Sequence, residues 1–296
     1  MSQIRAAAAA ALVALALTAG CNAGDSTDRA GDTSSLTSRS PAGRVTPALD
    51  SIAVLGHSGA TGTMSDVHDV GRDAHENSWA TGENPAVQSI YWRLLQTHPA
   101  MRGHNYDEAV NGTKVDALDG QLLTLLAEAD PLPDVLLVQS IDNDMRCDGT
   151  DPQNYGPYGA ALDEAISQMQ TAIPGVQVFL VSQWATVAGW TTWAAHRQDL
   201  VTDNTGTGPC GVFDASGAVR PAGVQSMQEI VDTYWRTVVQ VCSKHPGCYT
   251  DGGAEQAFTV TDRDLAADGN HLSIAGHHKF AAIAWRTLPP QITQRP

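Results

Sequence analysis

The chain has 296 residues, of which 42% are hydrophobic and 17% are charged. This composition excludes a wholly disordered protein and suits a folded globular one. Lys and Arg number 17 against 32 Asp and Glu, which gives a formal net charge of -15. Such a surface repels polyanions and lacks the basic stripe that nucleic-acid binding needs, so we expect no nucleic-acid partner.

The beginning of the chain has the pattern of a targeting segment. An apolar run from Ala6 to Leu17 follows Arg5, too short to span a bilayer but typical of a signal-peptide core. The sequence Leu-Thr-Ala-Gly-Cys at 17–21 resembles the lipobox of bacterial lipoproteins. This resemblance implies that residues 1–20 are removed, and that Cys21 is lipidated and anchors the protein to the outer face of the cell membrane. Plain secretion, with Cys21 incidental, is the alternative.

Two further regions follow. Residues 21–48 are rich in Ser, Thr, Gly and Asp, and they contain too little apolar surface to offset the entropy cost of ordering. We expect them to form a disordered tether. Residues 49–296 show no second linker and no repeat, and they predict one domain.

The remaining cysteines form an even set in a chain predicted to be exported, where two disulfides are the default. Three pairings are possible. We favour Cys242–Cys248, because the Ser-Lys-His-Pro-Gly segment between them can turn the chain back, and with it Cys147–Cys210. A zinc site is the alternative, but the chain contains no Cys-x-x-Cys pair.

From residue 49 onward, short apolar runs alternate with amphipathic ones. This alternation predicts an α/β fold with a parallel sheet covered on both faces. After the third clear strand we expect a long irregular excursion up to Cys210, in which Trp184, Trp190 and Trp193 either line an acyl or sugar pocket or pack in the core. In chain order the predicted elements are a strand at 51–56, a helix from Asn84-Pro85 to Pro99, a weak strand at about 104–110, a helix at 115–129, a strand at 133–139, a helix from Pro157, a strand at 176–182, and helices at about 224–242 and 273–288.

Polar segments stand at the ends of these elements. Gly-His-Ser-Gly occupies 56–59, Asn-Gly-Thr 111–113, Asp-Asn-Asp 142–144 and Asp-Gly-Asn-His 268–271. Ligands of parallel sheets bind beyond the carboxyl ends of the strands, where the first three segments should emerge. We therefore expect the chemistry of the protein at that edge.

Together these segments could supply a nucleophilic site. A serine hydroxyl needs a histidine to accept its proton, and the histidine needs a carboxylate to fix its tautomer. Ser58, His271 and Asp268 can fill these roles, with Asp262 and Asp264 as nearby alternatives for the acid. The backbone N–H groups of Ser58 and Gly112 and the side-chain amide of Asn143 can form an oxyanion hole.

The order Ser58, Gly112, Asn143, Asp268 and His271 resembles that of the SGNH hydrolases, also called GDSL esterases and lipases. The resemblance implies a flavodoxin-like three-layer α/β/α sandwich with a central parallel sheet, and cleavage of ester bonds without a cofactor or metal. Two positions depart from the family: His57 replaces the acid of its Gly-Asp-Ser block, and Ile141 replaces the glycine of its Gly-x-Asn-Asp block.

The expected function is that of an exported serine esterase that hydrolyses carboxylic esters through an acyl-enzyme. Its substrate would be a small-molecule, lipid or acylated-sugar ester. The same site could serve an acyltransferase or deacetylase acting on polysaccharide, and a non-catalytic solute-binding lipoprotein is a further alternative. The run His57, His68, Asp69, Asp73 and His75 fits no metal-ligand spacing, so we expect no metal there.

Overall fold

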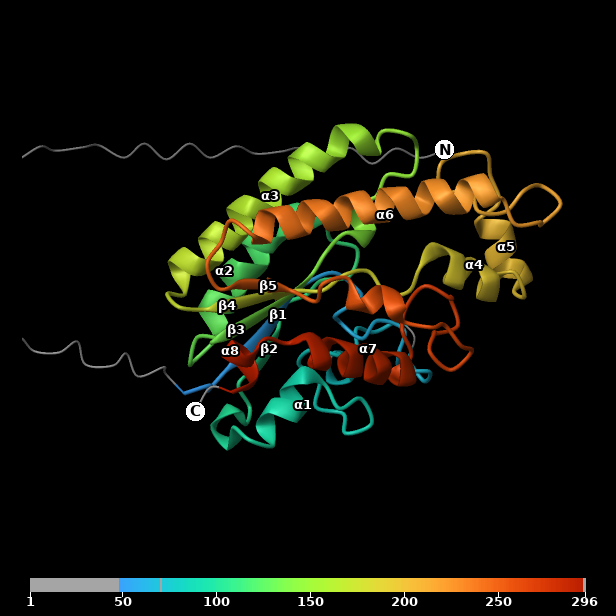
Figure 1. Ribbon diagram of the computed structural model, residues 1–296. Coiled ribbons are helices and arrows are strands. Elements are labelled where there is room, and N and C mark those ends of the chain that lie inside the picture. The colour runs from blue at the N-terminus through green and yellow to red at the C-terminus, as the bar shows by residue number, and fades with distance from the viewer. Residues whose placement is uncertain (1–47, 70, 295–296) are drawn as a thin grey trace, which may run out of the picture. The chain divides into compact units, whose positions relative to one another are not determined.

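The computed structural model describes residues 48–69 and 71–294. The predicted signal peptide, Cys21 and nearly all of the predicted tether lie outside the described residues. The five strands of the sheet are all parallel and lie in the order β2-β1-β3-β4-β5 (Figure 1). This confirms the predicted flavodoxin-like sandwich. The strands are β1 (Ile52–Gly56), β2 (Asn105–Asp107), β3 (Val135–Gln139), β4 (Gln177–Leu180) and β5 (Cys248–Thr250).

Successive side chains of a strand point to opposite faces of the sheet, and each face has its own helices. Ile52 and Val54 of β1 belong to the core cluster that contains residues of α1 (Ile90–Leu95) and α7 (Ile274–Thr287). Ala53 and Leu55 belong to the opposite cluster. That cluster contains residues of α2 (Leu118–Glu128), α3 (Asp151–Ala172) and α6 (Pro221–Cys242), which lie on the same side of the sheet in Figure 1.

A third, smaller cluster lies beyond the end of the sheet. It joins α4 (Val187–Ala194) and α5 (Gln198–Asp203) to α6, which runs past the sheet in Figure 1. The disulfide Cys147–Cys210 links the loop after β3 to this region, and Cys242–Cys248 links the end of α6 to β5. These are the two pairings that the sequence favours, and they are typical of an exported protein.

Several predicted boundaries are wrong. The helix expected from Asn84 begins only at Ile90, because Gln88 has φ +50 and Ser89 caps the helix by accepting a hydrogen bond of 3.0 Å from Trp92 N. The helix expected from Pro157 begins at Asp151, with Pro157 inside it. Pro157 and the residue four positions before it are exposed, so water can reach the carbonyl that the proline leaves unbonded.

The excursion after β4 contains two helices rather than irregular chain. Strand β5 and the short α8 (Pro290–Thr293) were also not predicted. In the part of the chain that the structure describes, no helix is long and apolar enough to cross a membrane.

Candidate active site

Ser58 stands in the loop that leaves β1 at Gly56. Gly56 has φ +140, and a Cβ there would lie 2.0 Å from the carbonyl oxygen of Gln139 on the neighbouring strand, so only glycine fits. The Gln121 side chain binds both sides of Gly56, with Oε1 accepting from its N–H at 2.8 Å and Nε2 donating to its carbonyl at 2.8 Å. The loop that carries the candidate nucleophile therefore starts from a fixed position.

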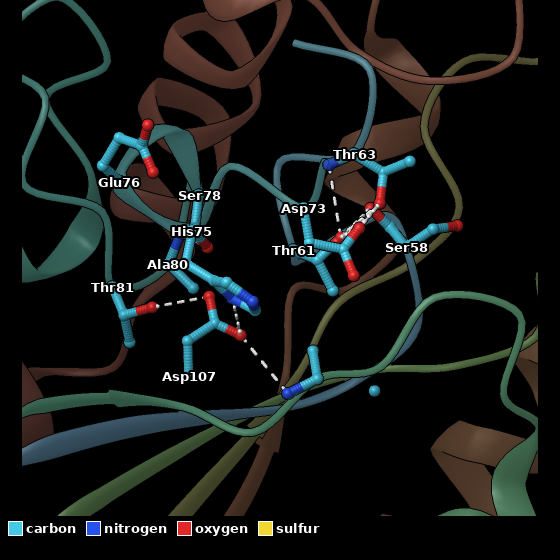
Figure 2. Close-up of polar contacts among 12 residues, drawn as sticks. Ser58, Thr61, Thr63, Asp73, His75, Glu76, Ser78, Ala80, Thr81 and Asp107 are labelled. Carbon is cyan, nitrogen blue, oxygen red and sulfur yellow. Dashed lines mark hydrogen bonds and ion pairs between the residues drawn. The ribbon is translucent and has the colours of Figure 1, made fainter. Parts of the chain in front are cut away.

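The loop after Ser58 is held by its own polar contacts. His57 Nδ1 accepts a hydrogen bond from Gly59 N at 3.0 Å, and Thr61 Oγ1 donates to Asp73 Oδ1 at 3.1 Å. Figure 2 shows the Ser58 hydroxyl pointing away from the contacts of Thr61, Thr63 and Asp73. The hydroxyl is thus free for chemistry on the other side of the loop.

His271 and Asp268 form a close pair just before α7. Asp268 Oδ2 accepts from His271 Nδ1 at 2.6 Å, and its Oδ1 accepts from the backbone N–H groups of Asn270 and His271, both at 3.1 Å. Burial alone would raise the pKa of Asp268, but these three hydrogen bonds outweigh it and lower the pKa to about 2. The carboxylate is therefore ionised and holds the imidazole with Nε2 available.

The other two acids considered for this role lie in different contacts. Asp262 Oδ1 accepts from the indole of Trp193 at 2.8 Å. Asp264 Oδ2 accepts from Thr261 and from Lys279 Nζ, at 2.7 Å and 2.9 Å. Of the three, Asp268 is the one that contacts His271.

Ser58 and His271 lie at the same edge of the sheet. Asn270, next to His271, lines the same cavity as Ser58. Burial lowers the pKa of His57, the neighbour of Ser58. The nearby Asp142 raises this pKa in part, and His271 lowers it further. Among the described residues the Ser58 hydroxyl has no hydrogen bond, to His271 or to any other group.

The candidate oxyanion donors lie on two neighbouring loops. Gly112 is exposed, with φ +77, in a turn that Thr113 ties to β1 by donating from Oγ1 to Gly56 O at 3.0 Å. Asn143 Nδ2 donates to Thr113 O at 2.8 Å, which leaves its second N–H unused. The backbone N–H groups of Ser58 and Gly112 have no acceptor among the described residues.

Ile141, just before the 142–144 segment, has an unusual backbone conformation. The residue has φ +110, in the left-handed region that favours glycine, yet its β-branched side chain is fully buried in the core. The isoleucine thus holds a backbone conformation that glycine adopts readily, at a cost in strain.

Asp142 and Gln183 were not singled out from the sequence, although both line the cavity beside Ser58. Gln183 Nε2 donates to Asp142 Oδ1, and Asp142 Oδ2 lies 3.9 Å from His57 Nε2. Burial raises the pKa of Asp142, while His57, His271 and Gln183 lower it in part. The available signals were the place of Asp142 in the 142–144 segment after β3 and the place of Gln183 just after β4.

The histidines and acids near Ser58 do not gather into one cluster. His75 Nδ1 lies 3.2 Å from Asp107 Oδ1, and Thr81 donates to the same carboxylate at 3.1 Å (Figure 2). Within residues 48–69 and 71–294, no group of three or more His, Cys, Asp or Glu side chains is arranged to hold a metal ion.

No protein-family model matches the sequence. A search of curated proteins found no match either. Solved structures do resemble it. LAE5, an α/β hydrolase enzyme from the metagenome of Lake Arreo in Spain, is 18% identical, with a TM-score of 0.50 over 82% of this chain and 97% of its own.

Two further solved structures are less similar. A family 3 carbohydrate esterase from Clostridium thermocellum is 15% identical, with a TM-score of 0.48 over 80% of this chain and 93% of its own. A catalytic mutant of Axe2, an acetylxylan esterase from Geobacillus stearothermophilus, is 16% identical, with a TM-score of 0.47 over 80% and 93%. The strand order and the similarity to LAE5 together show that this chain has a three-layer α/β/α fold with a central parallel sheet.

Proposed function

We propose that this protein is an exported serine esterase. Ser58 attacks the carbonyl carbon of an ester, and His271 accepts the hydroxyl proton and gives it to the leaving alcohol. Water, deprotonated by the same histidine, then releases the acid from the acyl-enzyme. The observation that carries this proposal is the 2.6 Å contact of His271 with Asp268, at the same sheet edge as an unbonded Ser58 hydroxyl.

The negative charge of the tetrahedral intermediate requires donors. We assign this role to the backbone N–H groups of Ser58 and Gly112 and to the second N–H of Asn143. Each lacks an acceptor among the described residues, and the Asn143 amide is held in place through Thr113. Removing one such donor costs about 3 kcal/mol of transition-state stabilisation.

The test is covalent labelling together with turnover. A fluorophosphonate should label wild-type protein at Ser58, and hydrolysis of p-nitrophenyl butyrate should fall at least about 10⁴-fold in Ser58→Ala. Ser216→Ala, at an exposed serine that hydrogen-bonds Asp214, is the matched control and should keep both activities. Wild-type protein that neither labels nor hydrolyses any ester of the panel described below would refute the esterase.

We also propose that Cys21 is lipidated after removal of residues 1–20, and that residues 21–48 tether the domain 49–296 to the membrane. The lipobox-like sequence supports this. Mass spectrometry of the mature N-terminus should find a diacylglyceryl cysteine, and Cys21→Ser should abolish this modification. An unmodified mature N-terminus in the wild type, in a host with an intact lipoprotein pathway, would contradict the anchor.

A further inference from the structure

The lining, charge and size of the cavity beside Ser58 indicate which substrate group fits there. It has a volume of about 280 Å³ and lies between the loop after β3, the loop after β4, α4 and α6. Ser58 and Asn143 form part of its wall, so a group bound covalently to Ser58 lies against the cavity. The role of this cavity as a substrate pocket rests on the esterase function proposed above.

One side of the cavity is apolar. Met145, Trp190 and Met227 line it, and all three are partly buried at the border of the small cluster that joins α4 and α6. Val231 and Trp184, almost fully buried, extend this wall. Apolar side chains that border a hollow gain from an apolar ligand, because the ligand removes their surface from water.

The charge of the cavity also favours an uncharged ligand. Asp142 is the only ionisable side chain among the described residues that line it, and Gln183 is already bonded to that carboxylate. A negatively charged substrate group would meet this acid and no Lys or Arg. The cavity therefore disfavours anionic acyl groups.

The size of the cavity limits the chain it can hold. A volume of about 280 Å³ lies just below the range of about 300 to 1,000 Å³ that is typical of pockets for drug-sized ligands. This space exceeds what an acetyl group fills, and it is too small to enclose a long fatty-acyl chain. The acyl part stays on Ser58 while the alcohol departs, so the cavity suits the acyl part better.

We propose that this cavity is an acyl-binding site for uncharged acyl chains of roughly four to eight carbons, and that Met227 and Val231 of α6 set the chain length. Met227 and Val231 are one helical turn apart, so both side chains lie on the same face of α6. A bulkier residue at 227 shortens the accessible space, and a smaller residue at 231 deepens it.

The test is a panel of p-nitrophenyl esters from acetate to palmitate. Wild-type kcat/KM should be at least about tenfold higher for hexanoate than for acetate, and should fall by a similar factor towards palmitate. p-Nitrophenyl hydrogen adipate has the same number of acyl carbons as the hexanoate but carries a carboxylate, and it should be at least about tenfold poorer.

Two variants test the assignment to α6. Met227→Trp should move the preference to acetate or butyrate, and Val231→Ala should move it to longer chains. Val239→Ala, at an exposed position of the same helix, should leave the preference unchanged. Circular dichroism and the melting temperature establish that each variant is folded. If Met227→Trp does not fold, the conservative Val231→Ala still tests the assignment to α6.

Three results would overturn the acyl assignment while leaving the esterase intact. The first is a preference for acetate that neither folded variant alters. The second is a Met227→Trp effect that follows the alcohol in a series of alkyl acetates instead of the acyl chain. The third is hydrogen adipate cleaved as well as hexanoate. Failure of both labelling and turnover refutes the esterase itself.

Discussion

The indole Nε1 of Trp190 donates a hydrogen bond of 2.9 Å to the carbonyl oxygen of Gly269. Gly269 lies within the short loop from Asp268 to His271, and Trp190 also lines the cavity beside Ser58. One side chain of α4 thus contacts both the candidate substrate pocket and the loop that carries the candidate general base. Arg197, between α4 and α5, makes a second contact with this part of the chain: its guanidinium donates to Ala267 O, just before Asp268, at 2.8 Å.

Trp190→Phe should lower kcat by about five- to tenfold with little change in KM. The phenyl ring keeps most of the apolar wall, while the lost hydrogen bond, worth about 1 kcal/mol, loosens the loop of His271. Steady-state kinetics on p-nitrophenyl hexanoate measures this. Trp193→Phe is the control, because Trp193 lies on the same helix and donates to Asp262 outside this loop. Equal effects of the two variants would count against a positioning role for Trp190.

Asp268→Asn should reduce kcat by about 10³- to 10⁴-fold with only a small change in the melting temperature. The amide oxygen can still accept from the N–H groups of Asn270 and His271, so the loop keeps its shape, but the amide no longer fixes the tautomer of His271. Kinetics and thermal unfolding of the same preparation separate these two effects.

Asp262→Asn serves as the comparison for this variant, because that acid contacts Trp193 and not His271. It should retain most of the activity. If Asp268→Asn remains as active as Asp262→Asn, the orienting group of His271 lies elsewhere.

Much of this arrangement was predictable from the chain alone. β1 and β3 are continuous buried apolar runs, and the residues after them fall at one edge of the sheet because parallel strands share it. The pairing of His271 with Asp268 followed from their spacing before a capped helix. Local sequence therefore fixes these parts.

The remaining parts depend on distant packing. β5 is three residues long and only half-buried, so it carries no hydrophobic pattern, and its place next to β4 shows only in the folded chain. The contacts of Gln183 with Asp142 and of Trp190 with Gly269 depend on how the segment after β4 packs on the sheet edge. Neither pair has a spacing that a sequence pattern could reveal.

Ile141→Gly should destabilise the protein less than Ile141→Ala does. Both variants lose the buried side chain, at a cost of about 2 to 5 kcal/mol, but only glycine relieves the strain of φ +110, worth about 1 to 3 kcal/mol. Urea unfolding of the two variants measures the difference.

At most buried positions glycine destabilises a protein more than alanine does, and the expected order at Ile141 is the reverse. Val138→Gly and Val138→Ala, in the middle of β3, provide the contrast, because glycine should be the worse residue within a strand. If alanine proves better than glycine at 141 as well, the strain at this position is absent in solution.

Glu255→Gln should make the free energy of unfolding less dependent on pH. Glu255 is fully buried, and burial, followed by the nearby Asp251, raises its pKa well above the usual value of 4.5. The folded protein therefore holds a proton that the unfolded chain releases above that value, and stability falls by about 1.4 kcal/mol per pH unit as pH rises from 4.5 towards the folded pKa. The glutamine variant lacks this loss of stability.

Urea unfolding between pH 5 and 8 should show a steeper decline of the free energy of unfolding for wild type than for Glu255→Gln. Glu229→Gln, at an exposed position of α6, is the control and should follow wild type. Parallel pH profiles for wild type and Glu255→Gln would mean that the carboxyl is ionised in the folded protein, because the variant then removes no proton uptake on folding.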